Sequence, residues 1–138
     1  MRYHRPMRVR FHRIWRAVPV PVLIVSRLPG RLVGVCLGPA VVVRADHGDD
    51  WPTIVHELEH CKQFWRGGVV VHFLRYYLSR AYRLRAEVQA FRAELDACDA
   101  LERRRRLDDA ARALATGYRL QLDARTCRRL LAARVEPD

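Results

Sequence analysis

The chain has 138 residues, of which 50% are hydrophobic and 30% are charged, and its net charge is +11 at pH 7. This length suits one domain with a single core, and the composition is that of a globular protein rather than of a disordered or fibrous one. No apolar run approaches the roughly 18–20 residues that a membrane span needs, so we expect no transmembrane segment.

The positive charge is concentrated at the amino terminus, where the first 16 residues hold six arginines and no acidic residue. This pattern predicts a basic, partly disordered arm over residues 1–16, followed by one domain over residues 17–138. Such an arm, and a second arginine cluster at residues 103–106 between two helical patterns, would attract nucleic acid or an acidic partner surface. The alternative is compositional bias from a GC-rich genome, since 25 of the 26 basic residues are arginine and Lys62 is the one lysine.

The apolar segment at residues 17–25 raises the question of a signal peptide. It contains Pro19 and Pro21 and is followed by no small-residue cleavage site, so we expect a cytoplasmic protein instead. The cysteines at positions 36, 61, 98 and 127 form no C-x-x-C pair. In a reducing compartment, such scattered cysteines are expected to be small buried side chains rather than a disulfide framework or a zinc ribbon.

A β-branched apolar run at residues 22–25 and two further short strand-like runs at residues 32–37 and 41–43 follow. The turn signals Pro29-Gly30 and Gly38-Pro39 separate them. Short apolar runs joined by such turns predict a small antiparallel meander.

Helical patterns occupy the rest of the chain. Asp50 as N-cap and Pro52 in the first turn predict a helix over residues 51–65, ended by Gly67-Gly68. Its apolar stripe comprises Ile54, Val55, Leu58, Cys61 and Trp65. A second helical region covers residues 70–100 with a bend near 79–82, and two further helices are expected at 107–116 and from Asp123 to 131. The predicted fold is therefore α+β, with a small N-terminal antiparallel sheet followed by these helices.

The first predicted helix carries the motif His56-Glu57-x-x-His60. Residues i and i+4 lie on the same face of a helix, so both histidines can offer a ring nitrogen to one tetrahedral zinc ion. Glu57 is rotated by about 100° from His56, which keeps it off the metal but close enough to act as general base. The alternative is a solvated helix face that happens to hold two histidines.

A zinc hydrolase needs a third protein ligand and keeps the fourth position open. The downstream candidates are His72, Glu87, Glu94, Asp96 and Asp99. Glu87 is favoured because the small residues Ala86 and Ala90 would let its helix approach the first one closely. The alternative for Glu87 is a surface ion pair with Arg83, four residues earlier. The metzincin pattern is excluded because Gln63 and Arg66 stand where it requires glycine and histidine.

The segments at residues 56–65, 76–78, 82–83 and 87–91 resemble minimal gluzincins, and more narrowly the small metallopeptidases encoded by phages and prophages. The resemblance implies a zincin-like core in which His56, His60 and Glu87 hold Zn²⁺ and Glu57 is the catalytic base. It also implies the cytoplasm of a bacterial host. Larger gluzincins place an acid four residues after the glutamate ligand, but this position holds Phe91. The residue that orients the zinc histidines is therefore not identified by the resemblance.

These observations predict a zinc peptidase acting on a peptide or protein substrate, which would pair with an edge strand of the sheet. One alternative is a basic binding module, for nucleic acid or an acidic protein, on a metal-bound fold without turnover. Another is a closed structural zinc site with Cys61 or His72 as fourth ligand. Candidates for the group that stabilises the transition state are Tyr76, Tyr77, Tyr82 and His47.

Overall fold

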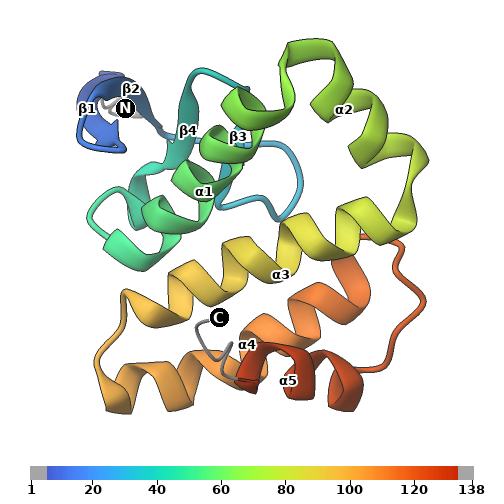
Figure 1. The fold of residues 1–138 in the computed structure, drawn as a ribbon. Helices are drawn as coiled ribbons and strands as arrows, with labels where there is room; N and C mark the ends of the chain where they lie inside the picture. Colours follow the sequence, from blue (N-terminus) through green and yellow to red (C-terminus); the bar gives the residue numbers. More distant parts are fainter. Residues whose placement is uncertain (1–5, 134–138) are drawn as a thin grey trace.

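A computed structural model describes residues 6–133 of the chain. Within this part, four strands, one short 3-10 helix (Ala45–His47) and five α-helices form an α+β fold (Figure 1). The strands are β1 (Arg8–Ile14), β2 (Val18–Val25), β3 (Gly34–Cys36) and β4 (Val41–Arg44). The helices are α1 (Trp51–Gly67), α2 (Val69–Leu78), α3 (Arg80–Asp96), α4 (Ala100–Gly117) and α5 (Ala124–Ala132). The same residues contain no helix that is long and apolar enough to cross a bilayer.

The sheet is mixed, with the strand order β1-β2-β4-β3. The predicted antiparallel meander is wrong at its centre, because β2 and β4 are parallel while β1–β2 and β3–β4 are antiparallel pairs. Residues 26–33 form a long connection between β2 and β3. This connection lets the β3–β4 hairpin lie with β4, rather than β3, beside β2. The strand with the two buried valines, Val41 and Val43, then takes the inner position, and β3 becomes an edge strand.

The predicted basic arm is also wrong where the structure describes it. Seven residues of this segment form β1, which pairs with β2 along its whole length. Trp15 and Arg16 both have positive φ in the turn between the two strands, a conformation that matches the twist of a hairpin. Ile14 is buried in the core, so the segment is part of the domain. Residues 1–5 of the predicted arm lie outside the described part of the chain.

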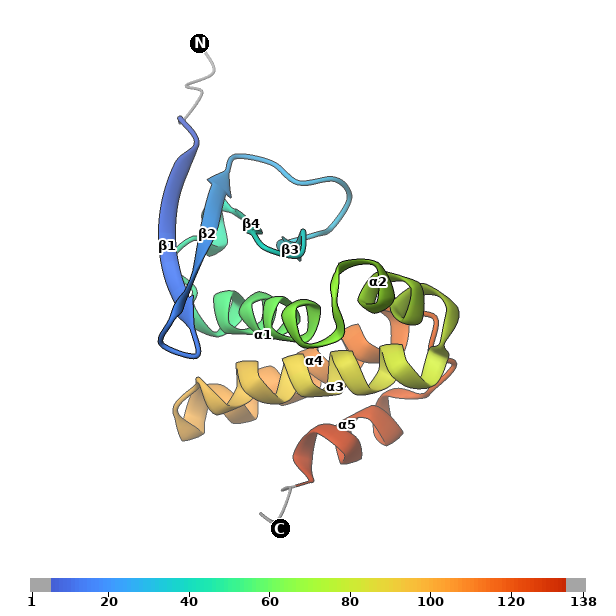
Figure 2. The same ribbon diagram turned by 45° about the horizontal axis from the view of Figure 1, so that its top comes forward.

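Helix α1 lies between the sheet and α3 and presents a different face to each (Figures 1 and 2). Ile54, Leu58 and Cys61 are buried against the inner face of the sheet. His56, His60 and Gln63 are two residues out of step with this stripe, so they point about 200° away and meet α3 instead. The predicted helix is confirmed, but the Asp50 side chain makes no capping hydrogen bond to it. Of the predicted apolar stripe, Val55 is only half-buried and Trp65 is 48% exposed.

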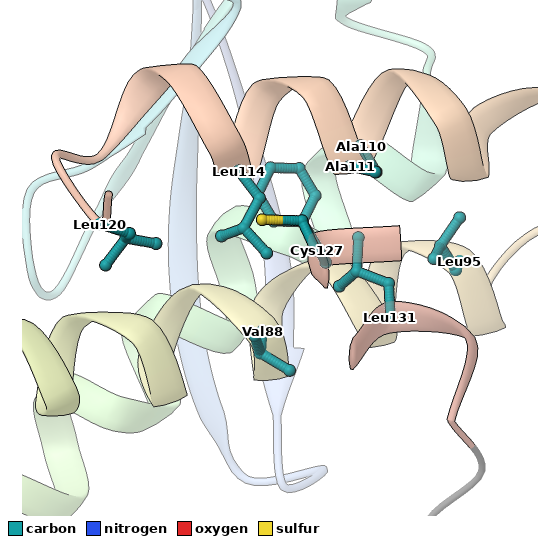
Figure 3. Close-up of a cluster of buried hydrophobic side chains, with 9 residues drawn as sticks. Val88, Leu95, Ala110, Ala111, Leu114, Leu120, Cys127 and Leu131 are labelled. Carbon is teal, nitrogen blue, oxygen red and sulfur yellow. The ribbon is translucent and has the colours of Figure 1, made fainter. Parts of the chain in front are cut away.

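A second core forms between α3, α4 and α5, where side chains from the three helices point toward one another (Figure 3). Helix α3 contributes Val88, Phe91 and Leu95 to it, and the predicted bend near 79–82 is a break at Ser79 between α2 and α3. Asp123 caps α5 as predicted, accepting a hydrogen bond from the Thr126 amide at 2.7 Å.

Helix α4 starts seven residues earlier than predicted, because Asp99 caps it and accepts from the Glu102 amide at 2.8 Å. The arginine cluster at residues 103–106 is therefore helical and does not lie between helices. Two of its members are ion-paired: Arg103 contacts Asp96 at 2.9 Å and Arg106 contacts three carboxylates. These two arginines are therefore less available for the predicted contact with nucleic acid or an acidic partner.

The second core predicts a contrast between two leucines on neighbouring helices. Leu95 is 0% exposed and Leu101 is 61% exposed. Leu95→Ala would leave a cavity and should lower the free energy of unfolding by about 2–5 kcal/mol. Leu101→Ala should change it by about 0.5 kcal/mol or less. Urea denaturation of both variants measures this, and equal losses would contradict the packing described here.

Candidate metal centre

Helices α1 and α3 bring the three predicted ligands together. Glu87 on α3 is 1% exposed and faces both histidines of α1. Its Oε2 atom lies 3.6 Å from His56 Nε2 and 3.3 Å from His60 Nε2. The alternative pairing of Glu87 with Arg83 does not occur, because Arg83 donates to the carbonyls of Tyr76 and Tyr118 instead.

These separations fit a single ion. Two donor atoms that are each about 2.0–2.1 Å from a tetrahedral zinc ion lie about 3.3–3.4 Å apart. The two Glu87 carboxylate oxygens are also in different situations: Oε1 accepts a hydrogen bond from the Tyr76 hydroxyl, whereas Oε2 is buried and has no hydrogen-bond partner among the described residues. A buried carboxylate oxygen without a partner is costly, and a cation at this position would satisfy it.

The hydrogen bonds of Gln63 determine which nitrogen of His60 is free. The Gln63 amide nitrogen donates to the Ala86 carbonyl at 2.9 Å and to the Gln89 side chain at 3.1 Å. Its oxygen must therefore face His60 Nδ1, 2.9 Å away, and accept from it. The proton of neutral His60 is thus on Nδ1, and the lone pair of Nε2 points toward Glu87.

Glu94 does the same for His56. Its Oε2 lies 3.0 Å from His56 Nδ1, and its Oε1 accepts from Arg106 at 3.1 Å. Arg106 also pairs with Asp50, the residue that precedes α1. Glu94 is therefore the orienting acid that was not identified from the sequence, and it lies seven residues after Glu87 rather than four. Seven residues are nearly two full turns, so both carboxylates are on the same face of α3.

The carboxylates create a strongly negative potential around the imidazoles. Burial lowers the pKa of His56, but Glu87 and Glu94 outweigh burial and raise this pKa to about 10. Burial also lowers the pKa of His60, and Glu87 reverses that shift. Burial by itself raises the pKa of Glu87, yet the two imidazoles hold it below its usual range. Without a cation, a proton shared between the carboxylates and the imidazoles would offset this negative potential. A metal ion can take the place of that proton.

Glu57 lies beside this cluster at the bottom of a cleft of about 230 Å³. Burial raises the pKa of its carboxyl group, while His56 and His60 oppose the rise. The edge strand β3 passes directly over it: a Cβ atom added at Gly34 would lie 3.1 Å from Glu57 Oε1. The glycine therefore permits the strand to approach the carboxylate closely.

The other sequence candidates lie outside the ligand cluster. Among residues 6–133, the group of side chains that could share an ion consists of His56, His60 and Glu87. His72 lines the cleft but bonds to the Tyr82 hydroxyl at 2.7 Å, and Cys61 contacts Cys36. Asp96 pairs with Arg103 and Asp99 caps α4.

Only some of the candidates for transition-state stabilisation line the cleft. Tyr76 and Tyr77 line the cleft, but the Tyr76 hydroxyl is occupied by Glu87. The Tyr82 hydroxyl is bound to His72. His47 lies near Asp50 and lines a second cavity, which His56 and Glu57 also line, rather than the cleft that holds Tyr76 and Tyr77. Sequence reasoning missed Tyr118, which lines the cleft from the linker between α4 and α5. The pattern Tyr118-x-Leu-x-Leu before the last helix resembles the ends of small gluzincins, but it does not indicate a role in the cleft, to which the tertiary fold brings this linker.

Comparisons of the chain with protein-family models, with curated proteins and with solved structures found no match. The resemblance to small gluzincins therefore stays a prediction, and the assignment of the site depends on its residues and geometry.

The cluster predicts which side chains hold the metal. The purified protein should contain about one zinc ion per chain, and His56→Ala, His60→Ala and Glu87→Ala should each lose most of it, because three protein ligands leave none to spare. Mass spectrometry of the metal content measures this. His72→Ala is the matched control, since this buried histidine lies outside the cluster and should leave zinc in place. Full zinc in Glu87→Ala would contradict the ligand set.

The role of Gln63 gives a separate prediction. Gln63→Ala removes the acceptor that holds the proton of His60 on Nδ1, so zinc affinity should fall about 10–100-fold while the fold persists. Competition with a chelating dye measures the affinity. Gln89→Ala is the control, because it removes only a partner of Gln63, and its loss should be smaller. Equal losses would show that His60 does not depend on this bond.

Proposed function

We propose that the protein is a zinc-dependent peptidase with a zincin-like core. The observation that supports this most directly is the convergence of two tautomerically fixed imidazoles and one unpartnered carboxylate oxygen at tetrahedral separations. The cluster also lies at the bottom of an open cleft, as a catalytic metal requires, with three protein ligands rather than four.

When bound at such a site, zinc polarises a substrate carbonyl and lowers the pKa of a coordinated water to about 7. The residues of the chain divide the remaining work. His56, His60 and Glu87 hold the ion, while Glu94 and Gln63 orient the histidines. Glu57 accepts the proton of the attacking water and then delivers it to the leaving amine. Its burial beside the imidazoles keeps bulk water away from this proton transfer.

The cleft suits an extended peptide. Besides the cluster and Glu57, its lining is apolar or uncharged: Leu32, Gly34, Val35, Cys36, Gly38, Phe64, His72, Phe73, Tyr76, Tyr77 and Tyr118. No arginine lines this cleft, although arginines are abundant in the described chain. The edge strand β3 forms one wall, so a substrate can pair with its free side. His72 and Tyr118 line the cleft wall, and we propose them as candidates for the group that contacts the reacting carbonyl.

The second candidate is a basic binding module without turnover. The exposed arginines of β1, such as Arg8 and Arg13, would support binding to nucleic acid or an acidic protein. A buried glutamate beside two metal-binding histidines has no purpose in such a module, and this favours the peptidase. A closed structural zinc site is disfavoured because neither Cys61 nor His72 joins the cluster.

Glu57→Gln separates the catalyst from the binder. The substitution keeps the size of the side chain but removes the basic oxygen, so zinc content and melting temperature should change little. Cleavage of a peptide library should fall about 10²–10⁴-fold, which is the usual contribution of a positioned base. Mass spectrometry of the cleaved library and zinc analysis of the same sample measure both quantities.

The control for this experiment is Glu59→Gln, on the same helix, where the carboxylate pairs with Lys62 at 3.2 Å and does not line the cleft. It should retain parental activity. A Glu57→Gln protein that cleaves as fast as the parent contradicts the mechanism. Tight binding of a polyanion by both proteins, without cleavage by either, would favour the binding module.

A further inference from the structure

Two cysteines from distant parts of the sequence meet beside the cleft. The Sγ atoms of Cys36 and Cys61 lie 3.3 Å apart, although the residues are 25 positions apart in the chain. Cys36 ends the edge strand β3, and Cys61 follows His60 on α1. The other two cysteines, Cys98 and Cys127, make no such sulfur contact among the described residues, and all four are free thiols.

The positions of the two sulfurs favour a bond between them. A disulfide has an S–S length of about 2.05 Å, so the sulfurs need to approach by only about 1.2 Å. The cysteine on α1 is completely buried in a helix packed on both sides, whereas its partner is part of a three-residue edge strand that pairs with β4 alone. A small shift of β3 can therefore supply most of the movement.

Reagents can reach one sulfur of the pair but not the other. Cys36 is partly exposed and lines the cleft, and the Gly38 amide donates to its sulfur at 3.3 Å. Cys61 is 0% exposed. The pair thus has one thiol that meets solvent and one that can act only on its neighbour, which is the arrangement of an attacking and a resolving cysteine.

We propose that Cys36 and Cys61 are a covalent modification site, which a small-molecule disulfide such as oxidised glutathione converts to an intramolecular disulfide joining β3 to α1. The Cys36 sulfur attacks the reagent, forms a mixed disulfide and releases one reagent thiol. Cys61 then attacks the Cys36 sulfur and releases the second. Two protons and two electrons pass from the protein to the reagent, which is reduced to two thiols.

The bond would hold one wall of the cleft. One end of the bond, Cys61, directly follows His60. The other end, Cys36, lies two residues after Gly34, whose backbone lies against Glu57. The closed loop spans β4 and most of α1, so cross-linking removes many conformations from the unfolded chain. Disulfide formation requires neither zinc nor catalysis, so its outcome is independent of the proposed peptidase activity.

The full-length protein is incubated with oxidised glutathione, and its thiols are then counted in denaturant. The count should fall from four to two per chain. After trypsin digestion, the peptides 32–44 and 45–62, which contain one cysteine each, should appear joined, with a mass two hydrogens below their sum. The oxidised protein should melt about 10 °C higher than the reduced one.

Two pairs of variants test the assignment. Cys36→Ser and Cys36→Ala should keep all three of their thiols, or carry only a glutathione adduct removable by reductant. Cys98→Ser and Cys127→Ser should still lose two thiols and yield the joined peptides. Circular dichroism checks that each variant is folded. The proposal is overturned if the parent keeps four thiols, if the thiols lost belong to a bond between chains, or if either Cys36 variant still loses two thiols to an intramolecular disulfide.

Discussion

The site depends on one interaction, the meeting of the buried Glu87 carboxylate with the Nε2 atoms of His56 and His60. A carboxylate removed from water needs a compensating charge or donors. Tyr76 supplies one hydrogen bond, and Arg106 pairs with the neighbouring Glu94. With both imidazoles neutral, no arginine or lysine among the described residues pairs with Glu57 or Glu87. A divalent cation would balance both, which agrees with the proposed zinc site.

This interaction requires α1 to present two faces at the same time, one to the sheet and one to α3. One stripe of the helix seals the inner face of the sheet, and the stripe two residues out of step carries the histidines toward α3. The break at Ser79 separates α2 from α3, so that Tyr76 can reach Glu87 from a neighbouring helix. Packing and chemistry therefore share the same helical periodicity, and a shift in register would disturb both.

The arginines illustrate how composition and function can be confused. Arg83 donates to the carbonyls of Tyr76 and Tyr118, Arg92 donates to the carbonyl of Leu130, and Arg106 joins Glu94 to Asp50. These side chains hold helix ends, the linker and the site in place. A genome that favours arginine thus supplies internal hydrogen-bond donors as well as surface charge, and net charge alone says little about a nucleic-acid partner.

Local patterns in the sequence were sufficient to place most of the helices and to select the three side chains that meet in the candidate site. The i, i+4 spacing of His56 and His60 places them on one face of a helix whatever surrounds it, and the Asp123 cap and the break before α3 depend on neighbouring residues only. Gln63 could have been recognised in the same way, since it lies one turn after His60.

Long-range contacts decided the rest, because residues far apart in the chain leave no mark in a local pattern. The parallel pairing of β2 with β4, the incorporation of residues 8–14 into the sheet, and the approach of Tyr118 to the cleft all depend on how complete elements pack. Cys36 and Cys61 show this most clearly: their spacing suggested two unrelated buried thiols, and only the packing of β3 on α1 brings the sulfurs into contact.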